Sequence, residues 1–155
     1  MNWLIKSYKK IILILIGIIL VYLAIYIDVV LRAKAAYYNA EKYLDWHYHP
    51  EKKEKYLQEE FEREKKKLDK LFSKGKLSQE EYNIQLELLE FNKQRQLQES
   101  SLKYAYIWYK TAVELFSPPQ SKWVKLAKQK MPIVKELWKK EIESKGYKVE
   151  DYMLE

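Results

Sequence analysis

An uninterrupted apolar run near the N-terminus constrains this chain more than any other feature. Residues 11–27 read IILILIGIILVYLAIYI, without a charged or strongly polar side chain. As a helix this run rises about 26 Å, and extending it past Asp28 through Leu31 gives about 31 Å. Because that length matches the hydrocarbon core of a bilayer, residues 1–31 are predicted to form a single transmembrane anchor.

Aromatic residues flank the apolar run where a bilayer meets water. Trp3 and Tyr8 stand at one end, and Tyr22 and Tyr26 stand toward the other. Tryptophan and tyrosine are enriched at both membrane interfaces, and Asp28 at the second interface carries only a modest cost. This pattern agrees with a membrane-spanning helix.

A cleaved signal peptide is the alternative interpretation of the N-terminus. Its basic region would be Lys6, Lys9 and Lys10, and residues 33–35 (AKA) imitate a small-x-small cleavage site. The apolar run is longer than a usual signal core, and Arg32 and Lys34 carry charge into the cleavage region. We therefore expect the segment to be retained.

The orientation prediction depends on the flanking cations. The N-terminal flank holds three lysines and no acid, whereas acidic residues dilute the cations of the other flank, which are Arg32, Lys34 and Lys42. By the positive-inside rule the N-terminus is expected inside, although the count of Lys and Arg is nearly even. This places the chain in the inner (plasma) membrane, with its soluble domain on the outer, periplasmic side.

Composition favours helices for the rest of the chain. Gly (3) and Pro (4) are rare, so the fold class is predicted to be all-α, with long helices and few turns. Cysteine is absent, which excludes disulfides, thiolate metal sites and thiol nucleophiles. Charged residues, mainly Lys and Glu, make up 33% of the chain, a composition that suggests a thermophilic source.

The net charge of +7 bears on the partners of the domain. A basic domain beside a bilayer is expected to meet anionic headgroups or an acidic protein. Nucleic acid is the competing partner, but arginine occurs only at Arg32, Arg63 and Arg95, and no Arg-rich recognition helix is present. We therefore expect no nucleic-acid binding.

Breakers and caps divide the soluble part into helices. The first helix should continue past the anchor to about Tyr48, because Pro50 is the first breaker after it. A second helix is expected over 51–73, and Gly75 marks the turn after it. Ser78 and Glu81 form a capping box for a third helix, which meets no Pro or Gly until Pro118 and is expected over 79–117. A fourth should run over 121–145 and end at Gly146 with a Pro132 kink.

The apolar faces predict a small helical bundle with a protruding antiparallel hairpin. Residues 51–100 carry only thin apolar stripes, which suit a two-helix hairpin arm. Residues 33–48 and 101–145 are richer in apolar side chains and should pack together as a base near the membrane. The soluble domain as a whole is expected over 32–155.

The turn of the hairpin resembles a known short motif. Its pattern is Leu68-x-x-Leu71-x-x-x-Gly75-x-Leu77-Ser78-x-Glu80-Glu81-Tyr82. Over residues 68–89 the chain resembles the helical hairpin called SHOCT. The resemblance implies no catalytic residue, and hairpin physics explains the same pattern.

A spaced pattern of small and aromatic residues recurs in the chain. Ala33-x-x-x-Tyr37-x-x-Ala40 reappears as Ala105-x-x-x-Tyr109-x-x-Ala112. It resembles the second helix of a tetratricopeptide (TPR) repeat, which would imply close helix packing and a partner-binding role. The Trp-Leu-Gly-Tyr pattern of the first repeat helix is missing, and close helix contacts alone explain the small residues equally well.

One polar cluster could bind a metal ion. Asp45, His47 and His49 would align in an extended segment, but on a helix His47 points away from the other two. A closed zinc site needs four ligands and the sequence does not supply the others, so no metal and no cofactor are expected. Because the carboxylates lie in Lys/Glu runs, and no phosphate loop or triad signature occurs, the chain is expected not to be an enzyme.

The aromatic stretch 104–116 is the strongest candidate for a functional surface. Tyr109 lies on one helical face, and Tyr104, Trp108 and Leu115 lie on another. A helix that is apolar on two sides is central in its own domain or docked on a partner. We predict that these four residues bind a partner, the alternative being an aromatic-rich core.

These observations lead to two main hypotheses about function, with a membrane-surface binder as a third class. The first is a non-catalytic accessory or scaffold subunit of a larger membrane protein complex, which binds other subunits through its anchor and base. The second is a membrane-tethered, TPR-like adaptor or assembly factor that binds partners transiently.

Overall fold

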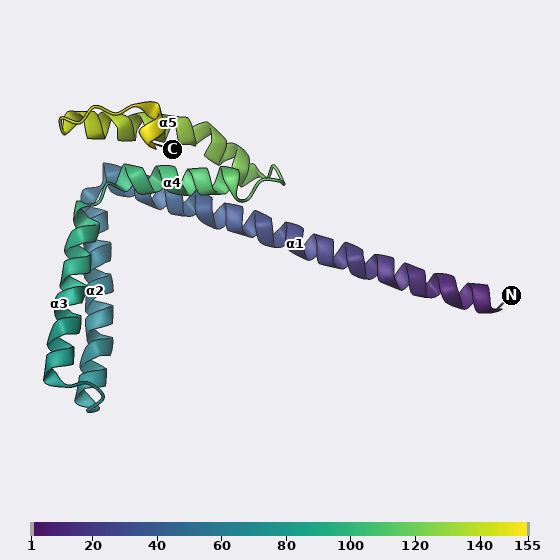
Figure 1. The fold of residues 1–155 in the computed structure, drawn as a ribbon, viewed down its shortest axis with the longest axis horizontal. Helices are drawn as coiled ribbons and strands as arrows, with labels where there is room; N and C mark the ends of the chain where they lie inside the picture. The colour runs from purple at the N-terminus through teal and green to yellow at the C-terminus, as the bar shows by residue number, and fades with distance from the viewer. Residues whose placement is uncertain (1, 155) are drawn as a thin grey trace. The chain divides into compact units, whose positions relative to one another are not determined.

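The computed structural model describes the backbone of residues 2–154 and the side chains of residues 12–150 and 152–154. Over this range the chain is helical and no strand occurs (Figure 1). The helices are α1 (Asn2–Tyr48), α2 (Pro50–Ser73), α3 (Gln79–Gln98), α4 (Ser101–Glu114) and α5 (Lys122–Ser144), followed by a short 3₁₀ turn (Asp151–Leu154). The predicted all-α class is confirmed.

The contacts divide the chain into two compact units. Unit 1 comprises Met1–Glu41 and Ala105–Glu155, and unit 2 comprises Lys42–Tyr104. Unit 2 contains the predicted hairpin arm 51–100 and also residues at the end of α1 and the start of α4. Each unit is described by itself below.

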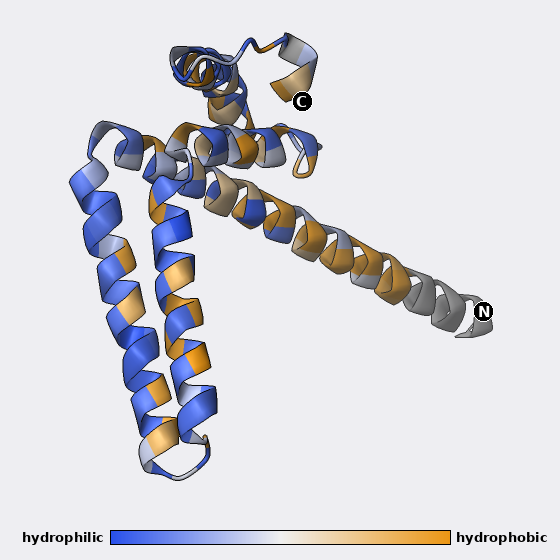
Figure 2. Ribbon diagram, turned by 60° about the vertical axis from the view of Figure 1, so that its left-hand side comes forward, coloured by the Kyte–Doolittle hydropathy of each residue, from blue (hydrophilic) through white to orange (hydrophobic). Residues whose placement is uncertain are grey.

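The N-terminal part of α1 is the apolar helix that the sequence predicts. Among the described residues it is the one helix whose length and composition would allow it to cross a membrane. Its large apolar side chains from Ile12 to Ile27 are all exposed in the isolated chain. Figure 2 shows this stretch of α1 as a mostly hydrophobic segment. Trp3, Tyr8, Lys6, Lys9 and Lys10, on which part of the interface and orientation predictions rests, lie outside the residues whose side chains are described.

The hairpin of unit 2 forms as its turn chemistry requires. Gly75 adopts a φ of +64°, a conformation that glycine reaches without strain, and its N–H donates to Phe72 O over 2.9 Å. Ser78 Oγ accepts from the Glu81 N–H, and Glu81 Oε2 accepts from the Ser78 N–H at 2.8 Å, so the predicted capping box is present. Pairing of α2 with α3 follows from this turn (Figure 1).

The prediction of one continuous third helix over 79–117 is wrong, because the helix is interrupted at Glu99. Glu99 has extended backbone angles (φ −66°, ψ 140°) between α3 and α4. The break is stabilised from α2: Lys53 Nζ donates to the carbonyl oxygens of Leu97 (3.1 Å) and Glu99 (2.7 Å). Ser100 Oγ accepts from the Lys103 N–H and so caps the start of α4.

The bounds of the last helix agree closely with their prediction. Ser121 caps α5 by accepting from the Val124 N–H, and Gly146, with a φ of +89°, follows its C-terminal end. The helix continues through Pro132. Val124, Ala127 and Val134 are its buried residues and mark the face that packs in unit 1.

Candidate interaction surfaces

Small residues let the three helices of unit 1 approach closely. The alanines at the contact are all 0–1% exposed: Ala33, Ala36 and Ala40 on α1, Ala105 and Ala112 on α4, and Ala127 on α5. Tyr37 and Tyr109 fill the space between them, with ring centroids 5.8 Å apart. Both copies of the Ala-Tyr-Ala pattern therefore serve the core, whatever their ancestry.

A polar cluster links the three helices of unit 1. Glu41 on α1 accepts a short hydrogen bond from the Tyr109 hydroxyl on α4. Lys130 on α5 donates to both carboxylate oxygens of Glu41, at 2.6 and 2.8 Å. The ammonium also lies 5.7 Å from the centre of the Tyr37 ring. We call these four residues the Glu41 cluster.

The Glu41 cluster shifts the pKa of each member in a direction that fits its contacts. Burial alone would raise the pKa of Glu41, but hydrogen bonds from Lys130, Tyr109 and Tyr37 outweigh it and lower the pKa. Burial, and then the hydrogen bond to Glu41, raise the pKa of Tyr109 well above its usual value. The carboxylate is therefore ionised at neutral pH and its oxygens are occupied by donors from its own fold.

A second aromatic group lies at the start of α5. The Trp123 ring packs against Tyr37 (5.6 Å) and Tyr38 (5.2 Å), both on α1. Lys34 and Lys122 place their ammonium groups 5.7 and 5.6 Å from the same ring. Tyr38 is exposed, so this group presents aromatic and basic side chains at the surface of unit 1.

Unit 2 contains an aromatic box that is filled by its own lysine. Tyr43 and Tyr104 stack at 5.2 Å, and Trp46 contacts Tyr43 and Tyr56 at 5.0 and 5.1 Å. Lys42 Nζ lies 4.8–5.1 Å from the centres of three of these rings. Such a box could hold a ligand cation, but here the cation is Lys42.

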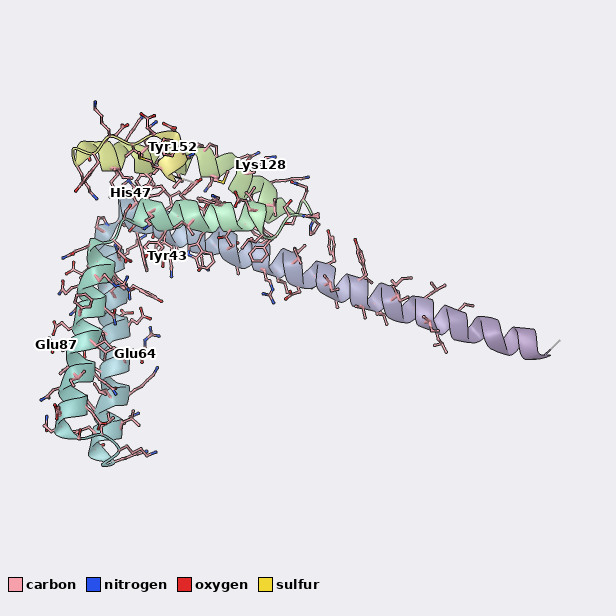
Figure 3. The ribbon with its side chains drawn as sticks, viewed as in Figure 1. Tyr43, His47, Glu64, Glu87, Lys128 and Tyr152 are labelled. Carbon is pink, nitrogen blue, oxygen red and sulfur yellow. The ribbon has the colours of Figure 1, made fainter. Side chains whose placement is uncertain are left out.

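Residues Asp45 and His49, considered above as candidate metal ligands, make hydrogen bonds within the chain. Asp45 accepts from the ring of His49 (2.8 Å) and from Lys52 (2.9 Å). The bond from Lys52, followed by that from His49, lowers the pKa of Asp45. His47, marked with Tyr43 in Figure 3, packs its ring against Tyr48 at 5.0 Å instead. Among the described residues, no group of three His, Cys, Asp or Glu side chains is placed to hold a metal ion.

The four residues predicted to bind a partner have different environments. Tyr109 is 0% exposed and belongs to the core of unit 1, so a partner cannot reach it while the unit is folded. Tyr104 is half-buried, and its hydroxyl donates to Glu99 at 2.7 Å. Trp108 is also half-buried, whereas Leu115 is 72% exposed. Leu115 is thus the most exposed of the four, and Tyr104 and Trp108 are only partly accessible.

The sequence interpretation missed an apolar stripe on α3. Ile84, Leu88 and Phe91 are all exposed, at spacings of four and three that place them on one helical face. Beside this stripe a groove of about 480 Å³ between α2 and α3 is lined by Leu68, Leu71, Leu88 and Leu89 among others. Figure 2 shows such hydrophobic positions along both helices, and the spacing alone could have revealed the stripe.

Carboxylates of the hairpin are spread out rather than gathered. Figure 3 marks Glu64 on α2 and Glu87 on α3, two of the many acidic residues of this unit. The pKa of Glu81 is lowered by its backbone and side-chain bonds to Ser78, which are capping bonds. Helix capping therefore explains the lowered pKa of Glu81.

Comparisons with protein families, curated proteins and solved structures find no match for this chain.

Proposed function

We propose that the chain is a non-catalytic, membrane-anchored accessory or scaffold subunit of a larger membrane protein complex. The observation that carries this proposal is the uncovered apolar surface of α1 from Ile12 to Leu31. Apolar surface of this length is stable in lipid and unstable in water, since burial is worth about 25 cal/mol per Å². After Leu31 the same helix contributes buried residues to the core of unit 1. The anchor and part of the domain core therefore belong to one continuous helix.

The chemistry of the domain supports a binding role rather than catalysis. Glu41, a half-buried carboxylate, is hydrogen-bonded to Tyr109 and Lys130 and so links three helices. The aromatic box of unit 2 is filled by Lys42. These groups contribute to the fold, and their polar atoms are already engaged.

Partner subunits would contact apolar side chains that reach the surface. The candidates are the exposed stripe Ile84–Leu88–Phe91 on α3 and the half-buried Trp108 on α4, because large apolar side chains at a surface are typical anchors of protein interfaces. The orientation that we propose places the N-terminus inside and the domain on the outer side of the inner membrane.

A photo-crosslinking experiment tests this proposal. A photoreactive phenylalanine analogue replaces Trp108 in the full-length chain, which is expressed in its native membrane and purified in mild detergent. We expect crosslinks to one or a few membrane proteins that also co-elute at constant stoichiometry in gel filtration. The matched control places the analogue at Ile133, on α5, where no crosslink to the same proteins is expected.

The second hypothesis, a transient TPR-like adaptor, predicts a different result in the same experiment. The two Ala-Tyr-Ala patterns favour it, because all six residues are buried at helix contacts as they would be in such a repeat. An adaptor would give crosslinks in membranes but elute alone in gel filtration. A chain without crosslinks that elutes alone would contradict both hypotheses.

A further inference from the structure

The loop that joins α4 to α5 lies at the same height along the axis of α1 as the end of the predicted anchor. Within unit 1, α4 runs back along α1 (Figure 1), and Tyr109 packs against Tyr37. Leu115 follows Tyr109 by six residues, or about 9 Å of helix, and Leu31 precedes Tyr37 by the same length. Leu115 continues the helix by donating its N–H to Thr111 O at 3.0 Å. It is therefore level with Leu31, the predicted end of the anchor.

Leu115 is uncovered at this level. It is 72% exposed, the largest exposure among the large apolar residues of the described chain. Leu31, at the same height along α1, is exposed as well. Exposure of both leucines is expected if lipid covers both.

Trp123 and Tyr38 lie about one to two helical turns farther from the apolar run than Leu31 does. The Trp123 ring contacts Lys34 and Tyr38, which follow Leu31 by three and seven residues, or about 5–10 Å of helix. The polar headgroup layer is about 5–8 Å thick on each side of the hydrocarbon core. Trp123 is therefore at the depth where tryptophan and tyrosine are enriched.

The charge around this end of unit 1 is positive. Lys34, Lys122 and Lys125 are exposed there, and Lys122 lies beside the Trp123 ring. The nearby acids have basic neighbours: Asp28 pairs with Arg32 at 2.7 Å, and Glu114 pairs with Lys110 at 3.9 Å. Exposed lysines at headgroup depth attract anionic lipids.

We propose that residues 115–123 form a second membrane contact, in which Leu115 enters the edge of the hydrocarbon layer and Trp123 lies among anionic headgroups. This inference rests on the proposed function, because it requires α1 to cross the bilayer. The contact would hold unit 1 against the membrane surface through α4 and α5 in addition to α1. Leu115 is then a lipid contact rather than a protein contact.

Spin-label depth measurements test the contact, and the cysteine-free chain makes them direct. Single cysteines replace Leu115, Leu20 or Ile133 in the full-length chain, which is labelled with a nitroxide and placed in bilayers of phosphatidylcholine and phosphatidylglycerol. Collisions of the label with oxygen, which dissolves in lipid, are compared with collisions with a neutral nickel chelate, which stays in water. Ile133, 61% exposed and about 15 Å along α5 from Trp123, is the matched surface control.

We expect the label at Leu115→Cys to collide with nickel severalfold less often than the label at Ile133→Cys, at a depth between Ile133→Cys and Leu20→Cys. Equal nickel collisions at Leu115→Cys and Ile133→Cys, with Leu20→Cys in lipid, would overturn the second contact alone. A label at Leu20→Cys outside lipid would overturn the anchor itself. Shielding of Leu115→Cys from both reagents in native membranes, without shielding in pure lipid, would assign the site to a protein partner.

Varying the anionic lipid content of the bilayer tests the role of the lysines separately. The Leu115→Cys label should lie deeper when phosphatidylglycerol is present than in phosphatidylcholine alone, because Lys34, Lys122 and Lys125 approach anionic headgroups. The triple replacement of these lysines by Gln should remove the difference. An unchanged depth in both lipids would overturn the role of the lysines.

Discussion

Removing the Glu41 carboxylate should lower the free energy of unfolding by more than loss of its partly exposed ion pair with Lys130 alone would. In Glu41→Ala, the hydroxyl of the fully buried Tyr109 loses its acceptor, and an unsatisfied buried hydroxyl costs about 1–3 kcal/mol. The ammonium of Lys130, 38% exposed, returns to water, so loss of the ion pair adds at most about 1 kcal/mol. The total loss in the free energy of unfolding is about 1–4 kcal/mol.

A double-mutant cycle separates the buried hydrogen bond from the rest of this cost. Tyr109→Phe removes the donor, while Glu41 keeps Lys130, so this variant should lose only about 1 kcal/mol. The double variant Glu41→Ala/Tyr109→Phe should be more stable than the sum of both losses by about 1–2 kcal/mol, because no hydroxyl remains unsatisfied. The full-length protein in detergent is melted while circular dichroism is recorded. Strictly additive losses would refute the account of the Glu41 cluster.

Three further predictions follow from single contacts. Lys53→Met should cost about 2 kcal/mol and speed amide exchange near the α3–α4 break, whereas Lys52→Met, at an exposed ion pair, should change stability by less than about 0.5 kcal/mol. Because the folded pKa of Glu41 is lowered, its contribution is complete above the unfolded pKa of about 4.3 and is lost as the pH falls through the folded pKa. The stability of Glu41→Gln should therefore vary less between about pH 5 and pH 2 in urea titrations. Gly75→Ala should cost about 1 kcal/mol because of its positive φ alone, since a Cβ there meets open space, and equal melting of wild type and variant would contradict this.

Local sequence signals predicted most helix ends correctly. Pro50, the Ser78–Glu81 capping box and Gly146 act through neighbours within a few residues, so the sequence contains the whole interaction. The hairpin could be predicted for the same reason, because Gly75 lies between two amphipathic segments.

Side-chain contacts between residues far apart in the sequence could not be predicted from local patterns. The break at Glu99 depends on Lys53, which lies forty-odd positions earlier and in a charged segment that looks solvated. The pair of Glu41 and Lys130 depends on the packing of α1 against α5, and each residue alone resembles an ordinary surface charge. Neither contact has a local signature.

The partner-binding surface predicted over residues 104–116 is only partly available, because tertiary packing covers one side of it. The two-sided apolar character of residues 104–116 does not reveal which side the rest of unit 1 covers. Tyr109 is covered by α1 and lies in the core, while Leu115 at the end of α4 stays exposed. The exposed stripe on α3 at Ile84, Leu88 and Phe91 has helical spacing, so this part of the surface could have been predicted from the sequence.

The central claim, that α1 crosses a membrane and places the domain outside, has a direct test in the cysteine-free chain. Asn2→Cys and Ile133→Cys are expressed separately in full-length protein, and intact spheroplasts are treated with a membrane-impermeant maleimide. We expect labelling of Ile133→Cys in intact spheroplasts and of Asn2→Cys only after permeabilisation. The reverse pattern would invert the orientation and leave the span in place. Labelling of both cysteines in intact spheroplasts, or of neither until permeabilisation, would contradict a helix that crosses the membrane once.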